Sequence, residues 1–163
     1  MKKRSVTFVL TAATLCIAAQ NASAQQVSQE VDPKDQAKKS ATAFFNALLA
    51  ADLNAAMKLV DVPWFMDRQK VLQDKSEVET QFQGFVDKAR EGIVKLNKVI
   101  VVEDVENGML ARGEEQLKLL RSVTKEGDLV LQVVFETKDS GEEAAALLVR
   151  PGKDGAKIIG ISD

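Results

Sequence analysis

Residues 128–162 decide the fold: DLVLQVVFETKDSGEEAAALLVRPGKDGAKIIGIS. Three segments of this stretch are apolar and rich in β-branched residues, and short polar segments containing Gly or Pro separate them. This composition predicts strands at 128–137, 144–150 and 157–162. Turns this short join neighbouring antiparallel strands, so the stretch predicts an antiparallel meander.

One further strand and one short helix are expected upstream of the meander. Residues 98–105, KVIVVEDV, are dominated by valine and isoleucine and predict a strand. Residues 114–123, EEQLKLLRSV, carry Leu117, Leu120 and Val123 at helical spacing. This spacing predicts a helix between two strands.

Two helices are expected at the start of the domain. Asp32 predicts an N-cap and Pro33 the first helical position, and an apolar stripe at helical spacing follows them. Asp52 predicts the cap of a second, shorter helix over residues 53–60. We expect Pro63 to stop this helix, because proline cannot continue the helical hydrogen bonds.

A third helix is expected after the extended segment VPWFM at 62–66. Ser76 and Glu79 form an S-x-x-E capping box that predicts its start, and Gly92 predicts its end. Helices therefore precede the meander, an order typical of α+β domains in which helices pack on one face of a sheet. We expect one domain over residues 32–163, with N-terminal helices packed on a curved antiparallel sheet.

Residues 1–24 predict a cleavable signal peptide. They have a basic start, an uncharged run of 14 residues and an A-x-A site that ends at Ala24. The run is shorter than the roughly 20 residues that a membrane span needs. The only cysteine, Cys16, lies here, and Leu15 before it is not the small residue that lipoprotein processing needs. We expect residues 25–31 to be a flexible tether, and the domain to be exported to the periplasm or the exterior without a membrane segment.

The charge and residue types of the mature part exclude several functions. Cleavage would leave 19 basic and 24 acidic residues, a net charge of −5 that gives no support for nucleic-acid binding. The chain has no histidine and no tyrosine, so neither a Ser-His or Cys-His catalytic pair nor a His-ligated metal site can form. No phosphate-binding glycine motif occurs either. We expect no cofactor and no metal site.

The order of these segments resembles the nuclear transport factor two-like superfamily, the cone fold shared by ketosteroid isomerase, scytalone dehydratase and polyketide cyclases. The resemblance is carried by AKKSATAFFNALLAADLNAAMKLV at 37–60, by VPWFM, by DKSEVETQFQGFV at 74–86 and by the closing meander. It covers roughly residues 32–163 and concerns the fold, because no invariant chemical motif accompanies it. The helix expected at 114–123 is a departure, since many members run directly between strands there.

The resemblance implies an open-ended pocket between the helices and the sheet. All aromatic residues of the mature part would surround this pocket, or they would simply fill the core. A pocket lined by such groups would bind an apolar or amphipathic ligand. The aromatic residues concerned are Phe44, Phe45, Trp64, Phe65, Phe82, Phe85 and Phe135.

An enzyme of this superfamily without histidine or tyrosine would need two carboxylates in the cone, one of them kept neutral by burial. The candidates are Asp61, Asp67 and Glu103, which the resemblance places on or beside elements that line the cone. Each also has a simpler interpretation. Asp61 would be a polar residue at a helix end, Asp67 a solvated partner of Arg68, and Glu103 an outward side chain of a strand.

The second face of the expected sheet is partly apolar. Ile100, Val102, Val130 and Val134 would point away from the helices. Soluble monomers rarely leave such a patch in water, so we expect it to be covered. A two-fold homodimer with sheet against sheet is the simplest cover. The alternative is that the helix at 114–123 covers the face within one chain.

Two functions stay open from the sequence, besides a purely structural role in which the domain only dimerises and supports an envelope assembly. The first is an exported non-catalytic domain that binds a small apolar ligand or an envelope protein through its pocket or its sheet face. The alternative is an isomerase- or cyclase-type enzyme that uses carboxylates alone. The absence of histidine, tyrosine and cysteine from the mature part favours the first function.

Overall fold

The computed structural model describes residues 32–102 and 110–162, without the side chains of residues 87–91. The predictions for the leader, the tether and Glu103 therefore lie outside the described residues. In chain order the elements are α1 (Pro33–Leu49), α2 (Leu53–Leu59), β1 (Val60–Met66), β2 (Lys70–Leu72), α3 (Lys75–Gly92), β3 (Ile93–Val102), α4 (Glu114–Val123), β4 (Leu129–Thr137), β5 (Gly141–Arg150) and β6 (Lys157–Ser162).

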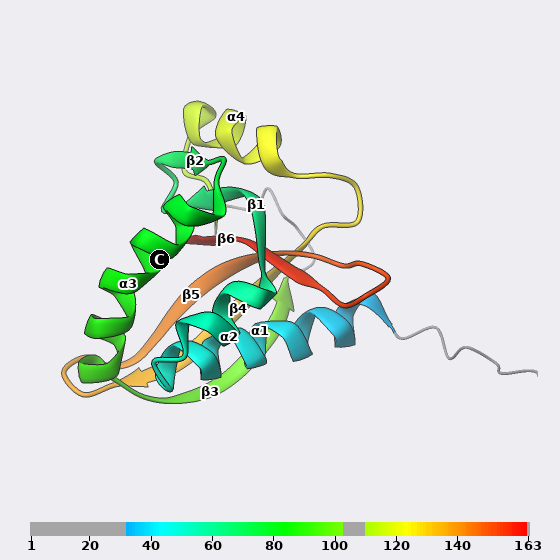
Figure 1. The fold of residues 1–163 in the computed structure, drawn as a ribbon. Coiled ribbons are helices and arrows are strands. Elements are labelled where there is room, and N and C mark those ends of the chain that lie inside the picture. The colour runs from blue at the N-terminus through cyan, green and yellow to red at the C-terminus, as the bar shows by residue number, and fades with distance from the viewer. Residues whose placement is uncertain (1–31, 103–109, 163) are drawn as a thin grey trace, which may run out of the picture.

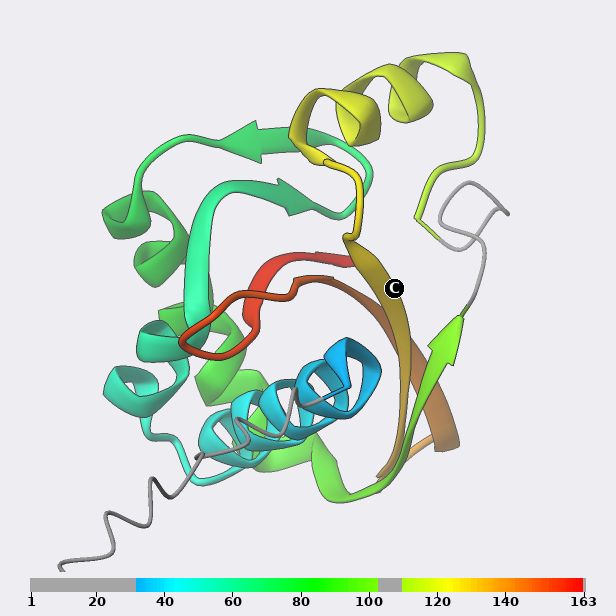
Figure 2. The ribbon, with the colours of Figure 1, turned by 90° about the vertical axis from the view of Figure 1, so that its right-hand side faces the viewer.

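The strands form one open sheet that curves around α1 (Figures 1 and 2). Their order is β2-β1-β6-β5-β4-β3. Helices α1, α2 and α3 pack against the concave face, whereas α4 lies on the outer side of the sheet (Figure 2). The expected α+β class and the meander of β4, β5 and β6 are confirmed. The sheet as a whole is mixed, because β1 and β6 run parallel.

The inner core lies between α1, α3 and the concave face of the sheet. Phe44 of α1 and Trp64 of β1 both contact Phe82 of α3, with ring centroids 5.5 and 5.1 Å apart in edge-to-face geometry. Trp64 is 1% exposed and Phe44 is fully buried, so these two rings are shut off from water. Each aromatic or aliphatic side chain buried in this way contributes about 1.5–3 kcal/mol.

Two of the predicted helix starts are confirmed. The carboxylate of Asp32 accepts a hydrogen bond of 2.8 Å from the Lys34 amide, and that of Asp52 accepts one of 2.9 Å from the Ala55 amide. The capping box was wrongly placed, because α3 begins at Lys75 and Ser76 already lies in its first turn. The chain supplies an acidic residue, Asp74, at the preceding position.

The prediction that Pro63 stops the second helix was wrong. Helix α2 ends at Leu59, and Pro63 lies within β1 after a cis peptide bond. The extended conformation expected for residues 62–66 is correct, and the strand starts two residues earlier, at Val60. Here the sheet, which supplies β6 as a parallel neighbour, determines where the helix ends.

The parallel joint between β1 and β6 depends on a glycine. A Cβ atom at Gly160 would lie 2.9 Å from both the Cβ and the carbonyl oxygen of Phe65 on the adjacent strand. Real Cβ atoms essentially never come this close, so the joint requires glycine at this position. The joint in turn holds the end of β1 beside Ile161.

The outer face of the sheet is partly covered within the chain. Val130 is 1% exposed and packs with Leu120 and Val123 of α4, together with Leu148 of β5. Val130 is thus unavailable to a second copy, which corrects its assignment to a dimer face. The reason is that α4 turns its apolar stripe onto this end of the sheet.

Val134 is also buried, at 5% exposed, which corrects its assignment to the dimer face as well. The other two proposed residues are more accessible, because Ile100 is 39% exposed and Val102 is half-buried. The homodimer remains a prediction for this smaller region.

A partly buried ion pair lies at the start of β4, at one end of the sheet. The guanidinium of Arg150 donates to both carboxylate oxygens of Asp128, at 2.9 and 2.7 Å, and to the carbonyl of Val123 at 2.7 Å. The Lys125 amide also donates to Asp128, at 2.8 Å. The side-chain hydrogen bond to Asp128 raises the pKa of Arg150 above its ordinary value. This end of the domain is therefore a fully bonded structural joint.

Candidate functional site

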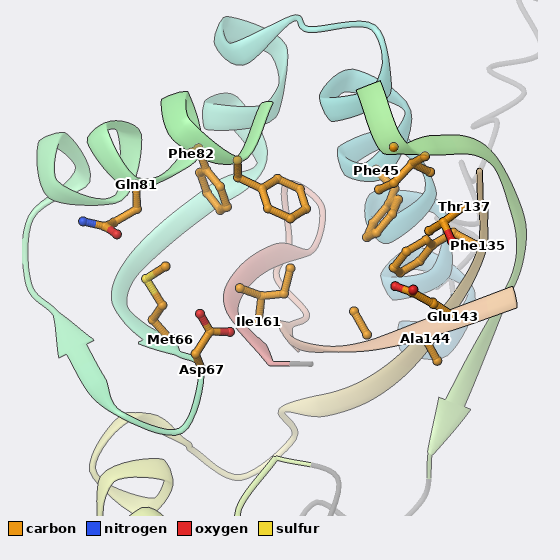
Figure 3. Close-up of a pocket in the computed structure, with 14 residues that line it drawn as sticks. Phe45, Met66, Asp67, Gln81, Phe82, Phe135, Thr137, Glu143, Ala144 and Ile161 are labelled. Atoms are coloured by element: carbon orange, nitrogen blue, oxygen red, sulfur yellow. The ribbon is translucent and has the colours of Figure 1, made fainter. Parts of the chain in front are cut away.

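A cavity of about 390 Å³ lies at the other end of the cone, between α3 and the β4–β5 hairpin (Figure 3). Its volume falls at the lower end of the roughly 300–1,000 Å³ typical of small-molecule sites. Most of the lining is apolar, and polar groups stand at a few points. The lining residues are Phe45, Met66, Asp67, Gln81, Phe82, Phe85, Gly92, Ile93, Phe135, Thr137, Glu143, Ala144, Ala145 and Ile161.

Four of the seven aromatic residues proposed for a pocket line this cavity. Phe45 and Phe135 stand together on one side, with ring centroids 5.3 Å apart, and Phe82 stands on the other side (Figure 3). Phe85 also lines the cavity and comes from α3, as Phe82 does. The remaining three do not reach it. Phe44 and Trp64 lie in the inner core behind Phe82, and Phe65 packs in the cluster under α4.

Asp67 reaches the cavity from the turn between β1 and β2 (Figure 3). Asp67 and Arg68 both have positive φ angles, 45° and 58°, and the Gln69 amide donates to the Met66 carbonyl at 3.0 Å. Positive φ at both central residues is the geometry of a type I′ hairpin turn, which normally takes Asn and Gly. A turn of this kind without glycine is strained, and strain of this sort gathers at functional sites.

The backbone amide of Asp67 also donates to the carbonyl of Ile161, at 2.9 Å. The bond ties the turn to β6 and fixes Asp67 at the edge of the cavity. Asp67 is half-buried there. Of the three carboxylates proposed from the sequence, Asp67 is the one that the described residues place at the cavity.

Glu143 faces Asp67 across the cavity (Figure 3). It lies on β5 opposite Phe135 of β4, two residues before the inward-facing Ala145. The sequence prediction missed it because the strand was expected to begin at Ala144, whereas β5 begins at Gly141. Alternation along the strand back from Ala145 and Leu147 would have placed Glu143 on the inner face.

The two neutral polar groups of the lining play different parts. Thr137 is engaged in the hairpin turn, where its hydroxyl donates to the Gly141 carbonyl at 3.2 Å and accepts from the Ser140 amide at 3.2 Å. Gln81 is exposed on α3, and its amide group points away from the middle of the cavity (Figure 3).

The other proposed carboxylates are not part of this site as far as the structure describes it. Asp61 lies on β1 away from the cavity lining and meets Lys75 at 3.9 Å, and both side chains are about half exposed. Glu103 lies outside the described residues. Among the described residues, the carboxylates that line this cavity are those of Asp67 and Glu143.

A second hollow, of about 590 Å³, lies at the Asp128–Arg150 end and is more open to solvent. Its most buried charged groups, Asp128 and Arg150, already satisfy each other. Within residues 32–102 and 110–162, no group of three or more acidic, histidine or cysteine side chains could hold a metal ion. No helix among the same residues is long and apolar enough to cross a membrane.

Comparison with known proteins identifies the fold. No protein-family model matches the chain, and no curated protein matches it in sequence. A cystatin-like fold protein of unknown function from Nostoc punctiforme superposes with a TM-score of 0.50 at 11% identity, covering 79% of this chain and 87% of that one. The chain thus has the cystatin-like fold, as the resemblance in sequence implied.

Two more distant structures belong to the same group of neighbours. A protein from Bacillus subtilis, provisionally described as an isomerase, has a TM-score of 0.44 at 11% identity and covers 81% of this chain and 87% of its own. A protein from Pseudomonas putida, provisionally described as a polyketide cyclase, has a TM-score of 0.42 at 13% identity over 77% and 88% of the two chains.

Proposed function

We propose that the protein is an exported domain that binds a small apolar or amphipathic molecule in the cavity between α3 and the β4–β5 hairpin. The observation that carries this proposal is the cavity of about 390 Å³ with four phenylalanines in its lining. An apolar wall with a few polar groups is the usual composition of a small-molecule site.

The position of the polar groups favours binding over catalysis. Glu143 is exposed and Asp67 only half-buried, so neither carboxylate is sealed from water. Catalysis of the isomerase type needs a carboxylic acid kept neutral by an apolar environment. A rim of solvated carboxylates around an apolar interior instead suits a ligand with one apolar and one polar part.

Trp64 provides the measurement, because it is the only tryptophan of the chain and the protein has no tyrosine. Its ring lies 5.1 Å from that of Phe82, which lines the cavity. Titration with a small aromatic probe should change the fluorescence of Trp64 and saturate. Ala145→Leu places a larger side chain in the cavity from β5. It should weaken this binding about tenfold or more, because the probe loses the space in which it contacts the wall.

Ala43→Leu is the matched control, because Ala43 is exposed on α1 outside the cavity lining and the substitution adds the same atoms. It should leave probe binding unchanged. Saturable binding that Ala145→Leu and Ala43→Leu affect equally would contradict the proposed site. A failure of every apolar and amphipathic probe to bind would contradict the proposed function.

A carboxylate enzyme is the second candidate, and the placement of Asp67 at the cavity favours it. Asp67 would abstract a proton from the carbon atom beside a carbonyl group of the substrate. Glu143 would be the second carboxylate, at the opposite wall of the cavity. Exchange of such a proton in a small cyclic ketone dissolved in D₂O tests this idea directly. Exchange that the wild type accelerates and Asp67→Asn abolishes would support the enzyme, whereas exchange at the buffer rate would exclude it for that substrate class.

Export is proposed from the sequence of residues 1–24. Expression of the full chain in a bacterium should yield a protein whose N-terminus is Gln25, and fractionation should place it outside the cytoplasm. Intact mass measurement checks the cleavage site. A full-length cytoplasmic product would contradict the export proposal without affecting the cavity.

A further inference from the structure

We propose that the ligand of this cavity is an organic cation, an amine or quaternary ammonium group attached to a small apolar body. The inference rests on the proposed binding function and specifies the class of its ligand. It follows from the charges around the cavity and from the aromatic groups in its wall.

The charges of the described lining all have one sign. Asp67 and Glu143 stand on opposite sides, and no lysine or arginine is among the described residues that line the cavity (Figure 3). Lys95, on the strand beside β4, is bound to Glu136 at 3.1 Å and not to Glu143. A cation that enters the cavity is attracted by the carboxylate of Glu143, and an anion is repelled by it.

The aromatic wall adds a second attraction of the same sign. Phe45 and Phe135 lie on the same side of the cavity as Glu143, while Phe82 is on the side of Asp67 (Figure 3). The face of an aromatic ring carries negative electrostatic potential and attracts a cation placed over it, especially one that is partly desolvated. Quaternary ammonium groups suit such a site, because they are charged but need no hydrogen-bond acceptor.

Other ligand classes fit less well. A carboxylate or phosphate ester would find no described cationic partner in the lining and would meet the like charge of Glu143. A fully neutral apolar molecule would fill the interior but would leave the carboxylates at the rim without a role. The apolar interior together with the acidic rim therefore selects a molecule that carries a positive charge at one end.

The test compares three probes of similar shape on the purified protein. Benzyltrimethylammonium is the cation, neopentylbenzene is its neutral isostere with carbon in place of nitrogen, and benzylsulfonate is an anion. Trp64 fluorescence and isothermal titration calorimetry measure their affinities. The cation should bind about tenfold or more tighter than the neutral isostere, and the anion should bind more weakly than either.

Glu143→Gln removes one charge and keeps the shape of the side chain. It should weaken binding of the cation about fivefold and leave the neutral isostere within about twofold, because the charge interaction is the part that is lost. Glu142→Gln is the matched control: Glu142 is adjacent on β5, lies outside the cavity lining and accepts from the Asn97 amide group at 3.2 Å. It makes the same change in net charge and should alter neither affinity.

Two results would overturn the inference. One is equal affinity for the cation and its neutral isostere. The other is an equal effect of Glu143→Gln and Glu142→Gln, which would show attraction to the net negative charge of the protein and not to this site. In both cases saturable binding of the neutral isostere would leave the proposed binding function standing, and only a failure of all probes would contradict both. The test uses Glu143 because Asp67 has further interactions of its own.

Discussion

The two ends of the β4–β5 pair hold carboxylates in opposite environments. At one end, Asp128 is buried with its side chain 3% exposed and is bonded to Arg150 and to the Lys125 amide. At the other end, Glu143 is exposed and faces Asp67 across a cavity. The same sheet thus carries one charge that is bonded within the fold and another that would face the ligand in the function that we propose.

The difference shows how to separate structural from functional acids in a small domain. A buried carboxylate with a bidentate guanidinium partner has no capacity left for a ligand, and its removal leaves an uncompensated buried charge. A carboxylate at the rim of an apolar cavity costs the fold little and can interact with a bound molecule. Substitutions at the two ends should therefore affect different measurements.

The largest expected effect on stability is at the end of the sheet that holds the Asp128–Arg150 pair. Asp128→Ala leaves the guanidinium of Arg150 in a mostly buried position without its partner, and the free energy of unfolding should fall by about 3–5 kcal/mol. Urea denaturation followed by Trp64 fluorescence measures the change. Asp61→Ala is the control, because its pair with Lys75 is about half exposed at 3.9 Å and should contribute at most about 1 kcal/mol. Similar losses of unfolding free energy for the two variants would contradict the distinction between buried, bonded acids and exposed ones.

An intermediate effect is expected where β1 joins β6. Gly160→Ala forces a Cβ atom against the backbone and Cβ of Phe65, and the free energy of unfolding should fall by about 1–3 kcal/mol. Gly84→Ala is the control, since Gly84 is exposed in α3 and its added Cβ would meet nothing within 4 Å. That variant should gain about 0.5–1 kcal/mol, because alanine favours a helix over glycine. A Gly160→Ala protein as stable as the wild type would contradict the prediction and show that β1 and β6 can move apart to accept the Cβ atom.

The smallest effect on stability is expected on the outer face of the sheet. We propose that its accessible part, around Ile100 and Val102, forms a two-fold homodimer. Ile100→Glu should change the free energy of unfolding by about 0.5 kcal/mol or less while shifting the sedimenting species from dimer to monomer. Gln83→Glu adds the same charge at an exposed position of α3 and should leave the dimer intact. A wild-type protein that sediments as a monomer would refute the dimer.

Much of the fold follows from local sequence, and the exceptions have a common cause. The caps at Asp32 and Asp52 and the helix at 114–123 were predicted because their signals lie within a few residues. Strand β2 and the parallel pairing of β1 with β6 were missed. Val60 pairs with Ile158, and no local pattern in either segment encodes such a distant partner.

The site was predictable in part for the same reason. Aromatic residues at helical spacing placed Phe45 and Phe82 toward a common interior, where both line the cavity. The prediction assigned both Trp64 and Phe65 to the pocket, although consecutive side chains of a strand point to opposite faces. Alternation along β1 and β5 separates Phe65 from the cavity and brings Glu143 into it, once the strand boundaries are known.

The position of β6 also affects how the domain forms. This strand comes after all the others in chain order and yet lies in the middle of the sheet, between β1 and β5. Until it is in place, β2-β1 and β5-β4-β3 are two separate sheets, so a closed core needs contacts between distant segments. Such contacts slow folding. A polypeptide that stays open during synthesis is suited to passing a membrane before it folds, which agrees with the export that we propose.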